Sequence, residues 1–187
     1  MTEFKVRQVP EILRAETIAR TRLFRVERLN LRFANGTEVE YERVPSSTID
    51  SVLVIPVLDA TTLLLVREYA AGTHRYELGF PKGVIEREEE LLAAANREIM
   101  EEVGYGAHRL RHLSSMTIAP GYIGHTTHIV LAEELYRQQL PGDEPEEIEV
   151  IPWSLDDTAR LLARTDFTEA RSIAALFLAR ETLQARL

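Results

Sequence analysis

The stretch GVIEREEELLAAANREIMEEVGY, residues 83–105, decides the fold because it joins strong helix formers to a dense negative charge. Glu98, Glu101 and Glu102 stand at i, i+3 and i+4, which places three carboxylates on one side of a helix. Like charges at these spacings destabilise an isolated helix by roughly 0.2–0.5 kcal/mol per pair. This side of the helix therefore either faces water or binds a cation.

Apolar residues form a second stripe beside the acidic one, at the helical spacing i, i+3, i+7 and i+11: Leu92, Ala95, Ile99 and Val103. Glu102 falls at the border of the two stripes, so we expect it to be partly buried. That setting suits a metal ligand better than a solvated charge. Gly104 is expected to end the helix, since glycine is common just after a helix C-cap.

Composition and charge limit the possible functions. The 187 residues fit one domain with a substantial core. A net charge of -8 argues against nucleic acid or an anionic membrane as the main partner, although bound cations would still allow a phosphate substrate. The absence of Cys excludes disulfides and thiolate sites. No apolar leader is present at the N-terminus, and the longest apolar runs are far below the roughly 18 residues of a membrane span. We expect a cytoplasmic protein.

The chain on either side of the central stretch predicts a mixed α+β fold. Alternating and apolar runs predict strands over residues 21–33, 38–44, 52–58, 62–69, 110–119, 126–132 and 148–153, and helical spacing predicts helices over residues 155–164 and 167–187. Asn35-Gly36 is expected to turn the first two strands into a hairpin. The N-terminal segment 1–16 shows no pattern and is interpreted as an extended arm. The sequence YELGFPKG, residues 76–83, is interpreted as an irregular lead-in to the helix.

The central stretch resembles the Nudix box, which reads Gly, five residues, Glu, seven residues, Arg-Glu, apolar, any residue, Glu-Glu, any residue, Gly, apolar. The defined positions are matched by Gly83, Glu89, Arg97, Glu98, Ile99, Glu101, Glu102 and Gly104. Only Tyr105 departs, at a packing position. The resemblance implies an α/β/α Nudix sandwich with a mixed sheet over residues 47–187. Residues 1–46 would form an N-terminal antiparallel hairpin or sheet that mediates a homodimer.

Further segments resemble the ADP-sugar pyrophosphatase branch of that superfamily. They are the N-terminal hairpin, the strand ending at residues 66–69, and Pro120, whose spacing from Gly104 is typical of the branch. Within the branch, residues 16–27, 33–36, 76–83, 142–146 and 169–181 resemble bacterial hydrolases of ADP compounds. Two segments depart from the branch: residues 122–125 lack its usual Glu, and residues 80–83 are more similar to diadenosine polyphosphate hydrolases. Both departures concern the choice of substrate.

The resemblance implies metal-dependent hydrolysis of the pyrophosphate bond in ADP-ribose, NADH and short diadenosine polyphosphates, with release of AMP. Hard oxygen ligands select Mg²⁺ or Mn²⁺ for such chemistry. Glu98 and Glu102 would be the main ligands, and Glu101 would be a further ligand or would support one from behind. Arg97 would orient a carboxylate by a pair of hydrogen bonds. The backbone carbonyl of Lys82 is a fourth candidate ligand.

Residues outside the helix complete the expected site. The family often places a general base in a late loop, and here Glu146 is the first candidate and Glu144 the second. An ordinary acidic loop is the alternative interpretation of these residues. The candidate substrate-binding residues are Arg67, Glu77, Lys82 and Pro120.

Two other functions are compatible with the same fold. One is a diadenosine polyphosphate or RNA-end pyrophosphohydrolase, although the acidic charge and the lack of a basic stripe count against RNA. The other is a non-catalytic ADP-ribose-binding sensor, which would be expected to carry a damaged box or an attached DNA-binding segment. Neither feature is present in the sequence.

Overall fold

The computed structural model describes residues 6–45 and 50–184, and it divides the chain into two compact units. The N-terminal unit comprises Met1–Ser47 and Ala119–His125, and the main unit comprises Thr48–Ile118 and Thr126–Leu187. The segment 119–125 joins the N-terminal unit through Val44, whose backbone N–H donates to Tyr122 O at 2.8 Å and whose carbonyl accepts from Gly124 N at 2.9 Å. The sequence did not indicate this second segment.

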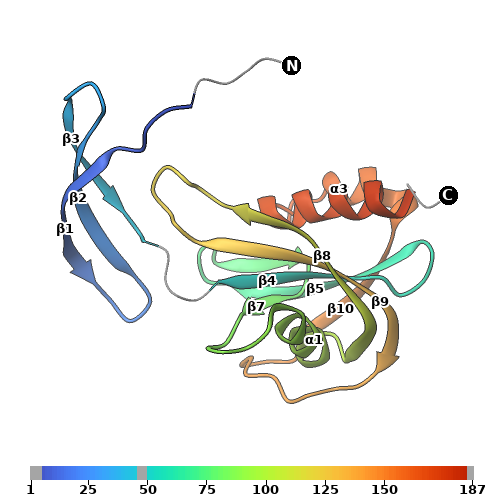
Figure 1. Ribbon diagram of the computed structural model, residues 1–187. Helices are drawn as coiled ribbons and strands as arrows, with labels where there is room; N and C mark the ends of the chain where they lie inside the picture. The colour runs from blue at the N-terminus through green and yellow to red at the C-terminus, as the bar shows by residue number, and fades with distance from the viewer. Residues whose placement is uncertain (1–5, 46–49, 185–187) are drawn as a thin grey trace. The chain divides into compact units, whose positions relative to one another are not determined.

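The N-terminal unit is a three-stranded antiparallel sheet (Figure 1), with the order β1 (Glu11–Arg20), β2 (Arg25–Arg32), β3 (Glu38–Arg43). The hairpin predicted around Asn35-Gly36 is confirmed. Phe33 N donates to Thr37 O at 2.9 Å, and Gly36 takes a positive φ of 84°. The interpretation of the segment 1–16 as an extended arm is wrong from Glu11 onward, because β1 pairs along its length with β2.

The two faces of this sheet differ in character. Strand register brings apolar residues from all three strands onto one face: Ile12, Ala15, Leu29, Leu31, Val39 and Tyr41. Among the described residues of this unit only Leu29 is a buried hydrophobic residue. The opposite face carries ion pairs, such as those of Arg28 with Glu16 and Glu40. The sheet therefore has an apolar face that its own unit leaves largely uncovered.

The main unit contains two sheets (Figure 1). The first has the order β7-β4-β9-β8, and its strands are β7 (Lys82–Val84), β4 (Ser51–Pro56), β9 (Thr126–Arg137) and β8 (Tyr105–Thr117). It is mixed, because β4 and β9 run parallel while the other pairs are antiparallel. The second is antiparallel, in the order β10 (Glu149–Ser154), β5 (Thr62–Ala70), β6 (Arg75–Gly79).

Helices cover the mixed sheet on its two faces. Alternate residues of β4 point to opposite sides, as strand geometry requires. Val52 and Val54 join a core with α1 (Leu91–Glu102), whereas Leu53 and Ile55 join a core with α3 (Ala170–Gln184). The main unit is therefore an α/β/α sandwich with a mixed sheet, which confirms the predicted fold class.

Several boundaries differ from the sequence-based predictions. The lead-in 76–83 contains most of β6 and the first two residues of β7, which were not predicted as strands. The helix expected over 155–164 is reduced to the 3₁₀ turn η1 (Leu155–Asp157) followed by the short α2 (Thr158–Leu162). Leu92 lies on the first turn of α1 and is exposed, whereas the rest of its predicted stripe is buried. No helix of the described chain is long and apolar enough to cross a membrane.

Candidate functional site

Strand β7 and helix α1 form the base of the site, and Gly83 lets them approach each other closely. β7 pairs with β4, which sets Gly83 beside Val52. A Cβ at Gly83 would lie 2.0 Å from Glu98 Oε1, so any side chain there would displace the carboxylate. The first position of the box is thus glycine because the Glu98 carboxylate occupies the space of a side chain.

Arg97 donates hydrogen bonds to three carboxylates of the box, and we call Arg97, Glu89, Glu98 and Glu101 the arginine cluster. Its Nη1 donates to Glu98 Oε1 at 2.8 Å and to Glu101 Oε2 at 3.0 Å. Nε and Nη2 each bind the Glu89 carboxylate at 2.9 Å, in the paired geometry typical of arginine and carboxylate. The hydrogen bonds from Arg97 lower the pKa of Glu89, and those to Glu89 raise the pKa of Arg97.

The turn before α1 positions Glu89 for this contact. Glu86 N donates to Glu89 Oε2 at 2.9 Å, and Glu89 N donates to Glu86 O at 3.1 Å. Between them Glu88 takes a positive φ of 69°, a left-handed conformation that is uncommon outside glycine. Arg97 also donates to Val84 O at 3.0 Å, which links the helix to β7. The arginine cluster therefore fixes how α1 sits on the strand before it.

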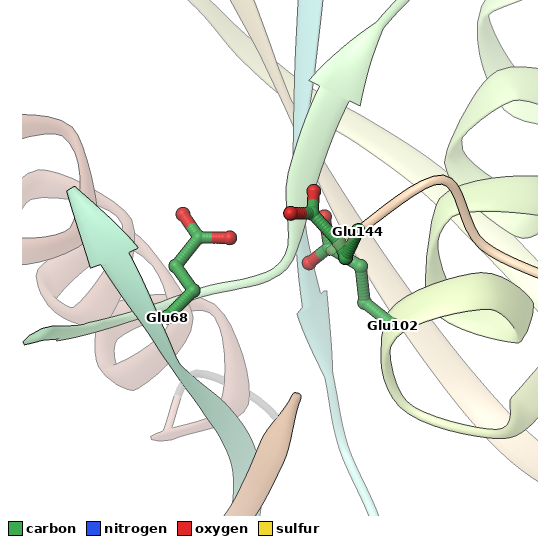
Figure 2. Close-up of side chains that lie close together, drawn as sticks. All are labelled: Glu68, Glu102 and Glu144. Carbon is green, nitrogen blue, oxygen red and sulfur yellow. The ribbon is translucent and has the colours of Figure 1, made fainter. Parts of the chain in front are cut away.

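A second group of carboxylates, Glu68, Glu102 and Glu144, lies apart from Arg97, and we call it the glutamate cluster. Figure 2 shows the three side chains converging from β5, from the end of α1 and from the loop between β9 and β10. One oxygen of each lies within 4.8 Å of the others. Glu102 is buried, with 8% of its surface exposed, Glu68 is half-buried and Glu144 is exposed. Residues distant in sequence are thus brought to one point.

The glutamate cluster carries more negative charge than its surroundings neutralise. Burial raises the pKa of Glu102 to about 9, and the neighbouring carboxylates of Glu68 and Glu98 add to the shift. Lys82 acts in the opposite direction: its Nζ lies 2.5 Å from Glu68 Oε1, and its backbone N donates to Glu102 Oε2 at 3.2 Å. Burial raises the pKa of Glu144 as well. One ammonium group thus faces three carboxylates.

This arrangement fits a hard divalent cation. All three side chains offer carboxylate oxygens, which Mg²⁺ and Mn²⁺ prefer. The oxygens converge, and the buried Glu102 is disfavoured as an isolated anion. A bound cation would supply the missing positive charge.

The structure distributes the predicted ligands over both clusters. Glu102 belongs to the glutamate cluster, whereas Glu98 and Glu101 contact Arg97. Glu98 is nonetheless buried, with 7% exposed, and burial raises its pKa. Lys82 contacts the glutamate cluster through its ammonium group and its backbone N–H, and a ligand role of its carbonyl stays a prediction.

Glu68 was not among the residues singled out from the sequence. It directly follows Arg67, a candidate substrate-binding residue, and the two alternate in exposure along β5. Arg67 Nη1 lies 3.2 Å from Glu149 Oε2, and its guanidinium lies over the ring of Tyr76. A role of Arg67 in substrate binding stays a prediction. The alternation of the strand could have drawn attention to Glu68, because consecutive residues of a strand face opposite sides and Glu68 therefore points away from Arg67.

The late loop separates its two candidate bases. Glu144 reaches the glutamate cluster, whereas Glu146 accepts a 2.6 Å hydrogen bond from the Tyr76 hydroxyl. That bond raises the pKa of the Tyr76 phenol. A cavity of about 1440 Å³ borders both loop residues and extends along α1 to Lys82 and Arg97. It has room for a nucleotide-sized ligand.

The other predicted substrate contacts lie in different places. Glu77 accepts a 2.8 Å hydrogen bond from Arg75, which lowers its pKa, and it lines a smaller cavity of about 380 Å³ together with Glu68 and Lys82. Pro120 belongs to a turn of the N-terminal unit, in which Ile123 N donates to Ala119 O at 2.8 Å. Roles of Glu77 and Pro120 in substrate binding stay predictions.

Comparison with protein families gives two matches that together span most of the chain. Residues 10–43 match the NudE-type Nudix hydrolase N-terminal domain, and residues 48–176 match the NUDIX domain. The first match covers the sheet of the N-terminal unit, and the second covers both clusters.

Several characterised proteins are similar to the chain. ADP compounds hydrolase NudE of Escherichia coli (strain K12) is 47% identical over 95% of each chain. ADP-ribose pyrophosphatase of Bacillus subtilis (strain 168) is 28% identical over 93% of this chain and 98% of its own. A crystal structure of an ADP compounds hydrolase superposes with a TM-score of 0.92 at 46% identity, covering 98% of each chain.

Proposed function

The chain belongs to the Nudix hydrolase family, and we propose that it hydrolyses the pyrophosphate bond of ADP-linked compounds, such as ADP-ribose, NADH and short diadenosine polyphosphates, releasing AMP. The observation that carries the proposal is the glutamate cluster, in which the buried Glu102 meets two further carboxylates with Lys82 as the neighbouring cation. A site of this kind is incomplete without a divalent cation, and it lies beside a large cavity.

Glu68 and Glu102 would hold Mg²⁺ or Mn²⁺, with Glu98 the next carboxylate one turn earlier on α1. When bound, such a cation neutralises phosphoryl oxygens and lowers the pKa of water. Arg97 binds Glu98, Glu101 and Glu89, so it keeps the helix carboxylates in place while leaving Glu102 outside its reach. Because Arg97 does not bind Glu102, the negative charge of the glutamate cluster remains available to attract the cation.

Glu144 is the residue that we assign as proton acceptor for the attacking water. It projects from a loop, it is exposed, and its carboxylate points to the oxygens of Glu102 and Glu68 (Figure 2). Burial and the neighbouring carboxylate of Glu68 raise its pKa, which increases its basicity. Glu146, the first choice from the sequence, is engaged by Tyr76 and ranks second.

The main unit also suggests how a pyrophosphate is attracted to an acidic site. The Lys82 ammonium lies at the glutamate cluster, and Arg137 borders the large cavity. These two cations would act together with the metal on the phosphates. The ADP part of the proposed substrate follows from the activities named for the similar proteins.

The proposal is tested by incubating the protein with Mg²⁺ and ADP-ribose, NADH, diadenosine triphosphate or ADP-glucose, and separating the products by chromatography. AMP should be released from at least one compound. Glu102→Gln should abolish its release, whereas Glu90→Gln, an exposed carboxylate just before α1, should not. No AMP from any of the four compounds would overturn the proposed function.

We also propose a homodimer formed through the N-terminal unit. On its apolar face, Ile12, Val39 and Tyr41 are 52%, 38% and 44% exposed. Strand pairing places Tyr41 beside the buried Leu29, and Ile12 and Val39 beside Leu31. A second copy of the sheet would cover this face. Light scattering at micromolar concentration should give twice the chain mass, and a monomer would contradict the proposal.

A cytoplasmic location stays a prediction from the sequence.

A further inference from the structure

The loop between β9 and β10 is held firmly where it begins. Gln138 N donates to Gly104 O at 3.1 Å, and Leu140 N donates to Met100 O at 3.1 Å. The side chain of Gln139 donates to Glu101 O at 2.8 Å. These bonds satisfy carbonyls at the end of α1 and fix the loop to the helix that carries Glu102.

The following part of the loop, residues 142–148, is held differently. Within the described chain, its one hydrogen bond is that from the Tyr76 hydroxyl to Glu146 Oε1, at 2.6 Å. Glu144 lies within this part and has no hydrogen-bond partner among the described residues. Apart from Ile148, which packs against the core, the bond to Glu146 is therefore the contact that holds the part of the loop around Glu144.

Tyr76 is well placed to anchor the loop because its ring is fixed from two sides. Strand register pairs Tyr76 of β6 with Tyr69 of β5, and their rings meet edge-on at 6.0 Å. The guanidinium of Arg67 lies over the Tyr76 ring at 5.4 Å from its centre. Arg67 is in turn held by Glu149, the first residue of β10. The hydroxyl thus reaches the loop from a rigid hairpin.

We propose that Tyr76 is a positioning residue that holds Glu144 at the glutamate cluster by binding Glu146. The inference rests on the proposed function, since it assigns Glu144 a role in the reaction. The positions of the two glutamates are coupled through the backbone. Pro145 stands between them and restricts the backbone, so fixing Glu146 limits the positions open to Glu144.

Backbone NMR relaxation tests the contact independently of activity. In Tyr76→Phe the hydroxyl is lost and the ring remains, so the backbone order parameters of the non-proline residues in 142–148 should fall toward the values below about 0.6 that mark flexible backbone. Tyr69→Phe is the matched control: it removes the hydroxyl that meets His74 Nδ1 at 2.7 Å and should leave this loop unchanged. Unchanged order parameters in Tyr76→Phe overturn the proposal, whatever the activity.

Kinetics with ADP-ribose and Mg²⁺ test the consequence for the reaction. Tyr76→Phe should lower kcat about tenfold with KM changed less than twofold, since the loop acts on the reacting water. Glu146→Ala should match it, and Glu146→Gln should recover most of the loss because its amide oxygen still accepts a hydrogen bond. In a Glu144→Gln background, Tyr76→Phe should have no further effect, because the carboxylate to be positioned is missing.

The results of these experiments distinguish a positioning role of Tyr76 from a direct role of Glu146 in the reaction. A normal kcat in Tyr76→Phe, or multiplied losses in the double variant with Glu144→Gln, overturns the positioning role. If Glu146→Gln is as inactive as Glu146→Ala while Tyr76→Phe is active, Glu146 itself reacts and the proposal fails. An inactive wild-type protein overturns the proposed function and the role in the reaction with it, while the backbone order parameters still decide whether Tyr76 anchors the loop.

Discussion

Two acidic clusters in the main unit each set one cation against three carboxylates, but they differ in how the carboxylates are hydrogen-bonded. In the arginine cluster, one guanidinium makes hydrogen bonds to the carboxylates of Glu89, Glu98 and Glu101. In the glutamate cluster, the three carboxylates have only Lys82 as the cation in contact among the described residues, and burial raises the pKa of Glu102 to about 9. All three carboxylates of the first cluster are held by hydrogen bonds from Arg97, whereas the second cluster leaves converging carboxylate oxygens that a bound cation would ligate.

The comparison explains why a single helix contributes to both clusters. Arg97 reaches Glu101 one turn ahead and Glu98 beside it, and it fixes α1 against Val84 of β7. Glu102 lies beyond this network, at the end of the helix, where Glu68 and Glu144 can approach it. Structural and chemical roles are thus divided between neighbouring glutamates of one short segment.

Removing the charge at the centre of the glutamate cluster should have the largest effect. Glu102→Gln should lower kcat by roughly 10³-fold, the scale seen when one electrostatic contact to a transition state is lost. The cation-free variant should be at least as stable as the wild-type protein, because the neutral amide avoids the cost of a buried charge and can still accept from Lys82 N. Steady-state kinetics and urea unfolding in a chelator measure the two effects. A large loss of stability would mean that Glu102 is a structural residue.

Weakening the arginine cluster should affect both folding and activity, at a smaller scale. Arg97→Lys keeps the charge but cannot reproduce the forked contacts to Glu89, Glu98 and Glu101. We expect activity to fall by about 10–100-fold, as for other residues that hold metal ligands. The free energy of unfolding should fall by about 1–3 kcal/mol. Arg87→Lys, at an exposed neighbour, is the control and should change neither quantity.

The contact of Gly83 with Glu98 can be tested by adding one methyl group. A Cβ there would lie 2.0 Å from Glu98 Oε1, so Gly83→Ala must displace the carboxylate or the strand. Overpacking of this kind costs about 1–3 kcal/mol, and relaxation of the side chain should keep the loss near the lower end of that range. Gly72→Ala serves as the control, since nothing lies within 4 Å of its Cβ position. Equal stability of the two variants in urea would contradict the close approach.

Much of the fold could be predicted because buried strands and the central helix leave periodic patterns. The apolar runs of β4 and β5 are buried on both sides, and Gly104 ends α1 with a φ of 75° as expected. β1 escaped prediction because all of its residues are exposed except the half-buried Glu16, so no alternation marks it. β6 and β7 are short, and Pro81 lies between them. Strands that bury few side chains are not visible in a hydrophobic pattern.

The parts of the site that lie close together in the sequence could be predicted, whereas those formed by residues far apart in the sequence could not. The spacing of Glu98, Glu101 and Glu102 places them on one helix, which is observed as α1, and the predicted burial of Glu102 is confirmed. The spacing alone does not show that Arg97 binds both Glu98 and Glu101. Glu68 lies far from Glu102 in the sequence, on β5, and meets it only because the second sheet packs against α1. Such a contact depends on the assembled fold.

The cation itself should stabilise the folded protein by an amount similar to the cost of Gly83→Ala. A ligand that binds only the folded state at about ten times its Kd adds roughly 1.4 kcal/mol to the free energy of unfolding. For a chain of this length that corresponds to a rise in Tm of about 3–6 °C. Calorimetry with Mg²⁺ added after chelation should show this rise for the wild-type protein. It should be absent in Glu102→Gln, because a ligand of the glutamate cluster is lost, and reduced but detectable in Glu144→Gln, because Glu68 and Glu102 remain.

In Glu101→Gln the rise should persist, because Glu101 contacts Arg97 in the arginine cluster. Loss of the rise in Glu101→Gln with its retention in Glu102→Gln would place the cation at the arginine cluster and reverse the comparison.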